Sequence, residues 1–95
     1  MAIKVLIQRK AKRGKEEELN QIAREMRLKA MYAEGFISGE ALQSIQDPSI
    51  HLVISTWKSI ETWKKWLNSP YRKEIKKKIK AIIVGSEKMT PYQYE

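Results

Sequence analysis

The sequence contains no cysteine and a single histidine, His51. The absence of cysteine excludes a disulfide framework and thiolate chemistry within these 95 residues. Protein-only zinc and iron sites are built mainly from cysteine and histidine, so no metal site is predicted. We expect His51 on the surface beside the "DPSI" turn, because a lone histidine has no partner with which to do chemistry.

Long apolar runs are also missing. Charged residues interrupt "MAIKVLIQRKAKRGK" too early for a signal peptide. No run approaches the roughly 20 apolar residues that span a bilayer. We therefore expect a cytoplasmic protein with no membrane partner. The length predicts a single domain over residues 1–95, and a core this thin would gain from a partner subunit.

Positive charge is abundant, with a formal net charge of +8. Over half of it lies between Tyr71 and Ala81, where six basic residues and one glutamate give +5. Such a segment could attract nucleic acid, but a solvated helix face over Arg72–Lys80 is the simpler interpretation. RNA-binding sheets stack bases on exposed aromatic residues. The strands "ISGEALQSI" and "LVISTW" carry no such pair, so nucleic acid is not the expected partner.

Hydrophobic periodicity predicts an alternation of strands and helices. The expected order is a strand at 3–8, a helix at 15–33, strands at 36–46 and 51–57, a helix at 59–68 that restarts at 69–70, and a strand at 87–94. This β-α-β-β-α-β order predicts an α+β, ferredoxin-like fold, an antiparallel sheet with helices on one face. The other face has no cover within the chain, so we expect it to be buried against a second copy. Simple alternation in the second strand would place Gly39 and Ala41 on one face and Phe36 on the other, and Gly39 suggests a bulge or a close backbone approach.

All three tryptophans lie within ten residues, in "STWKSIETWKKWLNSP". Trp57 ends a predicted strand, and Trp63 and Trp66 share one face of the helix that follows. Large aromatic side chains on such faces are usually core, which is our interpretation of Trp57 and Trp63. For Trp66, a core position and a place in a pocket wall are equally open.

Several segments together resemble the antibiotic biosynthesis monooxygenase family of dimeric α+β barrels, over nearly the whole chain. They are "RGK" (13–15), "EGFISGEAL" (34–42), "DP" (47–48) and "VISTWKSIETWKKWLNSP" (53–70). The resemblance implies a homodimer that oxidises a small quinol- or phenol-type aromatic substrate with dioxygen and without a cofactor. One alternative is a non-catalytic dimer that binds a small hydrophobic ligand or heme. A third is a basic nucleic-acid-binding domain.

The resemblance implies only part of an active site. Trp66 matches the tryptophan of the family. Polyketide-oxidising members have an asparagine one helical turn earlier, where this chain has Thr62. Their tyrosine past the helix break falls near Arg72, with Tyr71 one residue away.

Heme-degrading members place a histidine ligand where this chain has Lys76, or a neighbour in "EIKKKIK", so no cofactor is predicted. Their first-strand asparagine falls at Ile7, or at Gln8 after a shift of one. An aromatic anion needs a donor, and the candidates are Thr62, Tyr71, Arg72 and Gln8. The apolar walls are expected from Trp66, Ile7, Ile22, Met26, Phe36 and Ile75.

Overall fold

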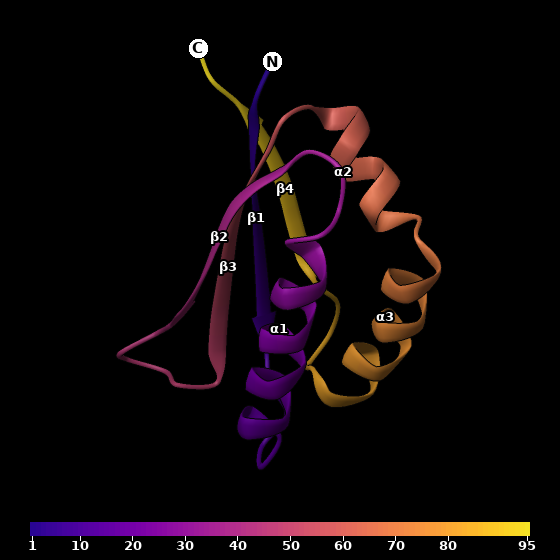
Figure 1. Ribbon diagram of the computed structural model, residues 1–95. Helices are drawn as coiled ribbons and strands as arrows, with labels where there is room; N and C mark the ends of the chain where they lie inside the picture. The colour runs from indigo at the N-terminus through magenta and orange to yellow at the C-terminus, as the bar shows by residue number, and fades with distance from the viewer.

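A computed structural model describes all residues, 1–95. Its elements are β1 (Ile3–Lys10), α1 (Glu16–Ala30), β2 (Phe36–Gln43), β3 (Ile50–Trp57), α2 (Ile60–Leu67), α3 (Pro70–Ile82) and β4 (Lys88–Gln93). The four strands form one antiparallel sheet in the order β2-β3-β1-β4. The three helices lie on the same side of this sheet (Figure 1). The predicted α+β, ferredoxin-like fold is confirmed. No helix is both long enough and apolar enough to cross a bilayer.

The break between α2 and α3 is made by two serine caps. The Ser59 hydroxyl accepts from the backbone N–H of Thr62, and the Thr62 hydroxyl accepts in return from the N–H of Ser59. This reciprocal capping box starts α2. The Ser69 hydroxyl accepts from the N–H of Arg72, and Pro70 stands in the first turn of α3. The predicted restart of the helix is therefore confirmed.

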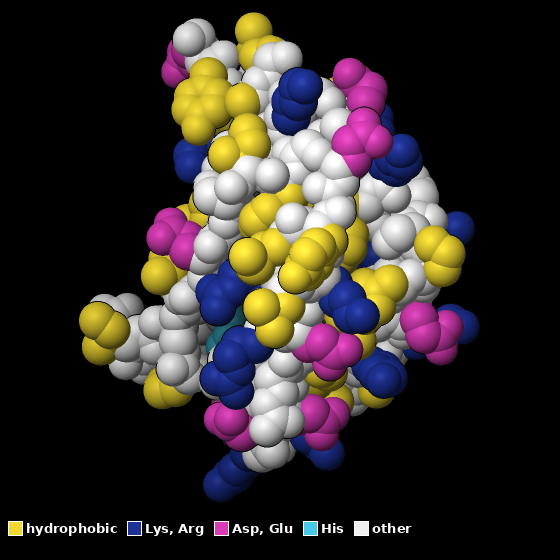
Figure 2. Space-filling view, in the orientation of Figure 1, with side chains coloured by type: hydrophobic (Ala, Val, Ile, Leu, Met, Phe, Trp, Pro, Cys, Tyr) yellow, Lys and Arg dark blue, Asp and Glu magenta, His cyan; other side chains and the backbone are white.

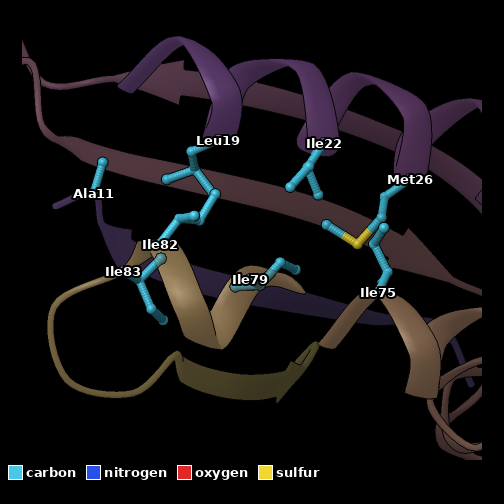
Figure 3. Close-up of a cluster of buried hydrophobic side chains, with 8 residues drawn as sticks. All are labelled: Ala11, Leu19, Ile22, Met26, Ile75, Ile79, Ile82 and Ile83. Atoms are coloured by element: carbon cyan, nitrogen blue, oxygen red, sulfur yellow. The ribbon is translucent and has the colours of Figure 1, made fainter. Parts of the chain in front are cut away.

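Two clusters of buried apolar side chains lie between the helices and the sheet. The first joins α1 and α3 (Figure 3) and consists of Ala11, Leu19, Ile22, Met26, Ile75, Ile79, Ile82 and Ile83. The second joins β1 to the tryptophans and consists of Ile3, Val5, Ile7, Ala30, Trp57 and Trp63. Trp57 and Trp63 are thus core residues, as predicted. Burying each aliphatic side chain contributes about 1.5–3 kcal/mol to stability before entropy costs.

The strand β2 contains an irregularity that simple alternation misses. Phe36 pairs with Trp57 and Ser38 with Thr56, so Ile37 is an extra residue in a β-bulge. The prediction that Phe36 faces away from Gly39 is therefore wrong. The bulge turns Phe36 to the helix side, where its ring meets Trp57 edge-on with centroids 5.3 Å apart. A Cβ atom on Gly39 would lie 3.2 Å from the Phe36 ring, so a glycine suits this position.

The opposite face of the sheet has no cover within the chain. Leu6 and Ile54 pair across its central strands and are only half-buried. Leu42 and Tyr92, from the two edge strands, remain largely exposed. This is the apolar face for which the sequence predicts a second copy of the chain.

Candidate functional site

A hollow bounded by aromatic side chains lies between the helices and the sheet. Its walls include Phe36 from β2, Trp57 from β3, and Trp63 and Trp66 from α2. The rings of Trp57 and Trp66 are stacked with centroids 6.1 Å apart, and Tyr71 lies 6.0 Å from Trp66. We call this space the tryptophan hollow. Apolar walls of this kind are typical of sites for planar organic ligands.

The tryptophan hollow is small in this structure. Its volume is about 60 Å³, which by the same measure holds a few water molecules. A planar ring therefore enters only if side chains at the border move aside. Trp66 is half-buried and Arg27 is exposed, so both have room to move.

Three charged side chains form a buried cluster beside the hollow. Nε of Arg9 donates to Oε1 of Glu87 at 2.9 Å, and Nη2 of Arg72 donates to Oε2 of Glu87 at 3.3 Å. Both arginines are only 3% exposed, and both border the tryptophan hollow. The cluster has two cations and one anion, so one positive charge is left over. A buried charge acts over a longer range than the same charge in water.

The pKa values of this cluster follow from burial and proximity. Burial works to raise the pKa of Glu87, but the charges of Arg9 and Arg72 outweigh it, so the pKa is lowered. The pKa of Arg9 is lowered by burial, against the opposing attraction of Glu87 and with a further contribution from Arg72. Arginine keeps its proton in proteins, so all three groups are charged at neutral pH.

Arg9 has donors to spare. Its one side-chain hydrogen bond within the chain runs from Nε to Glu87. His51 Nε2 is the single fully buried side-chain polar atom without a partner. The unpaired terminal nitrogens of Arg9 are therefore not sealed inside the protein. They can donate to a group that enters the tryptophan hollow.

His51 lies on the helix side of the sheet and is only 5% exposed. The prediction of a surface histidine is therefore wrong. In the register of β3, His51 pairs with Arg9 and Gln43 and shares the inward face with Val53 and Trp57. Burial lowers its pKa and Arg9 lowers it further, while the Pro48 carbonyl and Glu16 oppose the change.

Most of the expected wall residues border the tryptophan hollow, and two do not. Ile7, Met26, Phe36 and Trp66 line it. Ile22 and Ile75 are absent from its lining and pack in the α1–α3 cluster.

The expected donor residues are scattered. Arg72 borders the hollow, whereas the Thr62 hydroxyl is occupied in the cap of α2. Gln8 is exposed and lies on the uncovered sheet face, because it alternates with Ile7 and Arg9. Tyr71 contacts Trp66, and its pKa is raised by burial and then by Glu25, so it stays neutral.

No histidine borders the tryptophan hollow. Lys76, at the position of the family's histidine, is exposed on α3 and lies outside the hollow. The chain also has no group of three histidine, cysteine or acidic side chains placed to share a metal ion. The residues present therefore do not fit a heme held as in the heme-degrading members.

The sequence interpretation missed two members of the charged cluster. Arg9 continues the row of inward-facing residues Ile3, Val5 and Ile7 in β1. A charged residue in such an apolar row indicates a buried charge. Glu87 follows α3 in a connecting segment with no comparable pattern. Its carboxylate meets Arg9 across 78 positions of sequence, a distance that local patterns do not bridge.

Solved structures share this fold over nearly the whole chain. A conserved protein from Methanosarcina mazei Go1 superposes with a TM-score of 0.93 at 20% identity, covering 100% of this chain and 94% of that one. A protein from Mycobacterium tuberculosis gives 0.92 at 10% identity, with coverage of 100% and 96%. SnoaB, a cofactor-independent oxygenase from Streptomyces nogalater, gives 0.89 at 11% identity, with coverage of 99% and 93%. At such identities the likeness shows the fold alone.

The family of this chain is identified from its sequence rather than from its fold. A search of curated proteins gave no match. The sequence description of the antibiotic biosynthesis monooxygenase family, in contrast, matches residues 2–78. That span runs from β1 into α3 and includes the capped helix break and all three tryptophans. The chain therefore belongs to the antibiotic biosynthesis monooxygenase family.

Proposed function

We propose that the protein is a cofactor-independent monooxygenase that oxidises a small phenol- or quinol-type aromatic compound with dioxygen. The observation that carries the proposal is a tryptophan-walled hollow bordered by a buried cluster with one surplus positive charge. Family membership supports it, as does the printed description of SnoaB as a cofactor-independent oxygenase.

The chemistry requires the substrate to ionise. An electron-rich ring passes an electron to dioxygen readily once it has lost a proton, and a preorganised cation in a dry site stabilises that anion. Arg9 and Arg72 are the groups that border the hollow and carry this charge. The one carboxylate in contact with them, Glu87, is engaged by both. Glu40, the one carboxylate residue of the lining, alternates with Gly39 and Ala41 and so lies on the uncovered face of the sheet. The proton therefore leaves to solvent, and the rate rises with pH until the bound substrate is ionised.

A second copy of the chain completes the proposal. The half-buried Leu6 and Ile54 give the uncovered sheet face an apolar centre. A two-fold partner laid on that face would bury it in both copies at once. Each 100 Å² of apolar surface removed from water contributes about 2.5 kcal/mol before the costs of association.

Oxygen uptake with anthrone tests the oxidation directly. Anthrone and one dioxygen give anthraquinone and one water, so uptake and product should be equal in amount. We expect uptake in the presence of a metal chelator. Trp66→Phe should lower the rate about fivefold, because the smaller ring gives up aromatic contact worth about 1 kcal/mol. The same substitution should change the melting temperature little, since Trp66 is only half-buried.

Serum albumin serves as the control for anthrone oxidation that any apolar protein surface promotes. A wild-type rate equal to that control would support the alternative of a non-catalytic ligand-binding dimer. Equal rates for wild type and Trp66→Phe would show that the tryptophan hollow takes no part in the reaction.

A further inference from the structure

A second hollow lies next to the first, between α1 and the β2–β3 hairpin. Its volume is about 300 Å³, near the lower end of the range for small-molecule sites. The two hollows share five lining residues: Arg9, Ala23, Arg27, Ala41 and Val53. In Figure 2, basic side chains flank a recess between α1 and the hairpin, and the histidine colour is visible at its floor. We call this space the basic hollow.

The lining of the basic hollow contains three arginines and no acidic residue. Arg9, Arg24 and Arg27 border it, and no aspartate or glutamate is among its lining residues. Arg24 is 3.5 Å from Glu17 on the exposed side of α1. Arg27 forms no ion pair in the chain, although it borders both hollows. Arg9 and Arg24 have their counter-ions outside the hollow, in Glu87 and Glu17, so Arg27 is the cation of this lining that has no anionic partner.

The floor of the basic hollow also has unused polar groups. His51 borders it, and its buried Nε2 is without a partner. Buried polar atoms are nearly always paired, so an exception needs an explanation. The Gln43 side chain, in contrast, donates from Nε2 to the Pro48 carbonyl oxygen at 2.7 Å. The donors left for an anionic ligand are therefore mainly those of the arginines, because a neutral His51 that donates to the Pro48 carbonyl has only a lone pair on Nε2.

We propose that the basic hollow binds the carboxylate of an aromatic acid whose ring occupies the tryptophan hollow. A guanidinium presents parallel N–H donors that match the two oxygens of a carboxylate. Arg27 borders both spaces and so stands where the ring and its carboxylate would join. The inference rests on the proposed function for the place of the ring, and it narrows the substrate to anionic aromatic compounds.

Calorimetric titration with 2-naphthoate and with its neutral counterpart 2-naphthamide tests the inference on the intact protein. The two probes share the ring and differ in charge. We expect wild type to bind naphthoate at least about tenfold more tightly, the worth of one charge-assisted hydrogen bond. Arg27→Gln should remove most of that preference and leave naphthamide binding within about twofold of wild type.

Arg13→Gln is the matched control, because it removes the same charge from an exposed turn outside both hollows. Equal binding of the two probes by wild type would overturn the carboxylate site while leaving the ring site intact. The carboxylate site would also be overturned if Arg13→Gln reduced the preference for naphthoate as much as Arg27→Gln. A general attraction of anions to the basic protein would then explain that preference. Binding of neither probe would overturn both the carboxylate site and the ring site of the proposed function.

Discussion

Replacing Glu87 by glutamine is expected to lower the free energy of unfolding by about 3 kcal/mol. The substitution keeps the size of the side chain and removes its charge, so two buried guanidinium groups lose their only counter-ion. Breaking a buried ion cluster by removing one partner is costly, because the remaining charges cannot return to water. A domain of this size is stable by only some 5–15 kcal/mol in total. Urea denaturation at a fixed protein concentration measures the change.

The pH dependence gives this prediction a second, independent readout. The pKa of Glu87 is lowered in the folded chain from its ordinary value of 4.5. The unfolded chain therefore takes up a proton first as the solution is acidified. The stability that the carboxylate contributes is fully present above pH 4.5 and is lost as the pH falls through the lower, folded-state pKa. The difference between wild type and Glu87→Gln should shrink over that range.

Glu34→Gln is the matched control for burial. The ion pair of Lys65 and Glu34 has the same 2.9 Å distance as that of Arg9 and Glu87, but both of its side chains are about two-thirds exposed or more. Exposed ion pairs contribute little to stability, so this variant should unfold like wild type. If the two glutamine variants unfold alike, the buried cluster does not contribute as its geometry indicates.

Replacing Ile54 by glutamate is expected to convert the proposed dimer into a monomer. Ile54 lies at the centre of the uncovered sheet face and pairs with Leu6 and Glu40 on the neighbouring strands. A two-fold interface would contain the new charge twice, next to the existing Glu40 of each copy. Burying an unpaired charge costs several kcal/mol, so the dimer dissociation constant should rise at least about 100-fold.

Sedimentation velocity over a range of concentrations measures this change. Leu28→Glu is the control, because Leu28 is an exposed aliphatic residue on α1, away from the open sheet face. That variant should sediment as wild type does. A wild-type chain that stays monomeric at high concentration would contradict the proposed dimer, whatever the variants do.

The order and type of the elements could be predicted from the sequence because each has a local cause. Apolar periodicity marks the strands and α1, and Ser59, Ser69 and Pro70 mark the starts of α2 and α3. Gly39 indicates a bulge or a close backbone approach in β2, but the position of the bulge at Ile37 could not be predicted, because one inserted residue reverses the faces of a strand without changing its composition.

The aromatic part of the site was open to prediction, and its charged part was not. Trp66 and Phe36 stand out by residue type and by the family resemblance. Arg9 and Glu87 meet only after β1 and the segment before β4 come together. His51 was misjudged because a histidine next to a turn is usually exposed, whereas its phase in β3 turns it inward.

The ionisation of bound 4-nitrophenol is the measurement that tests the central claim most directly, namely that the tryptophan hollow stabilises an aromatic anion. The phenolate absorbs visible light, so its pKa can be read in the presence of saturating protein and in buffer alone. We expect the pKa of the bound compound to fall by about one pH unit, since Arg9 and Arg72 border the hollow with a surplus positive charge. A pKa that is unchanged, or raised as desolvation in an apolar site alone would make it, would contradict the claim.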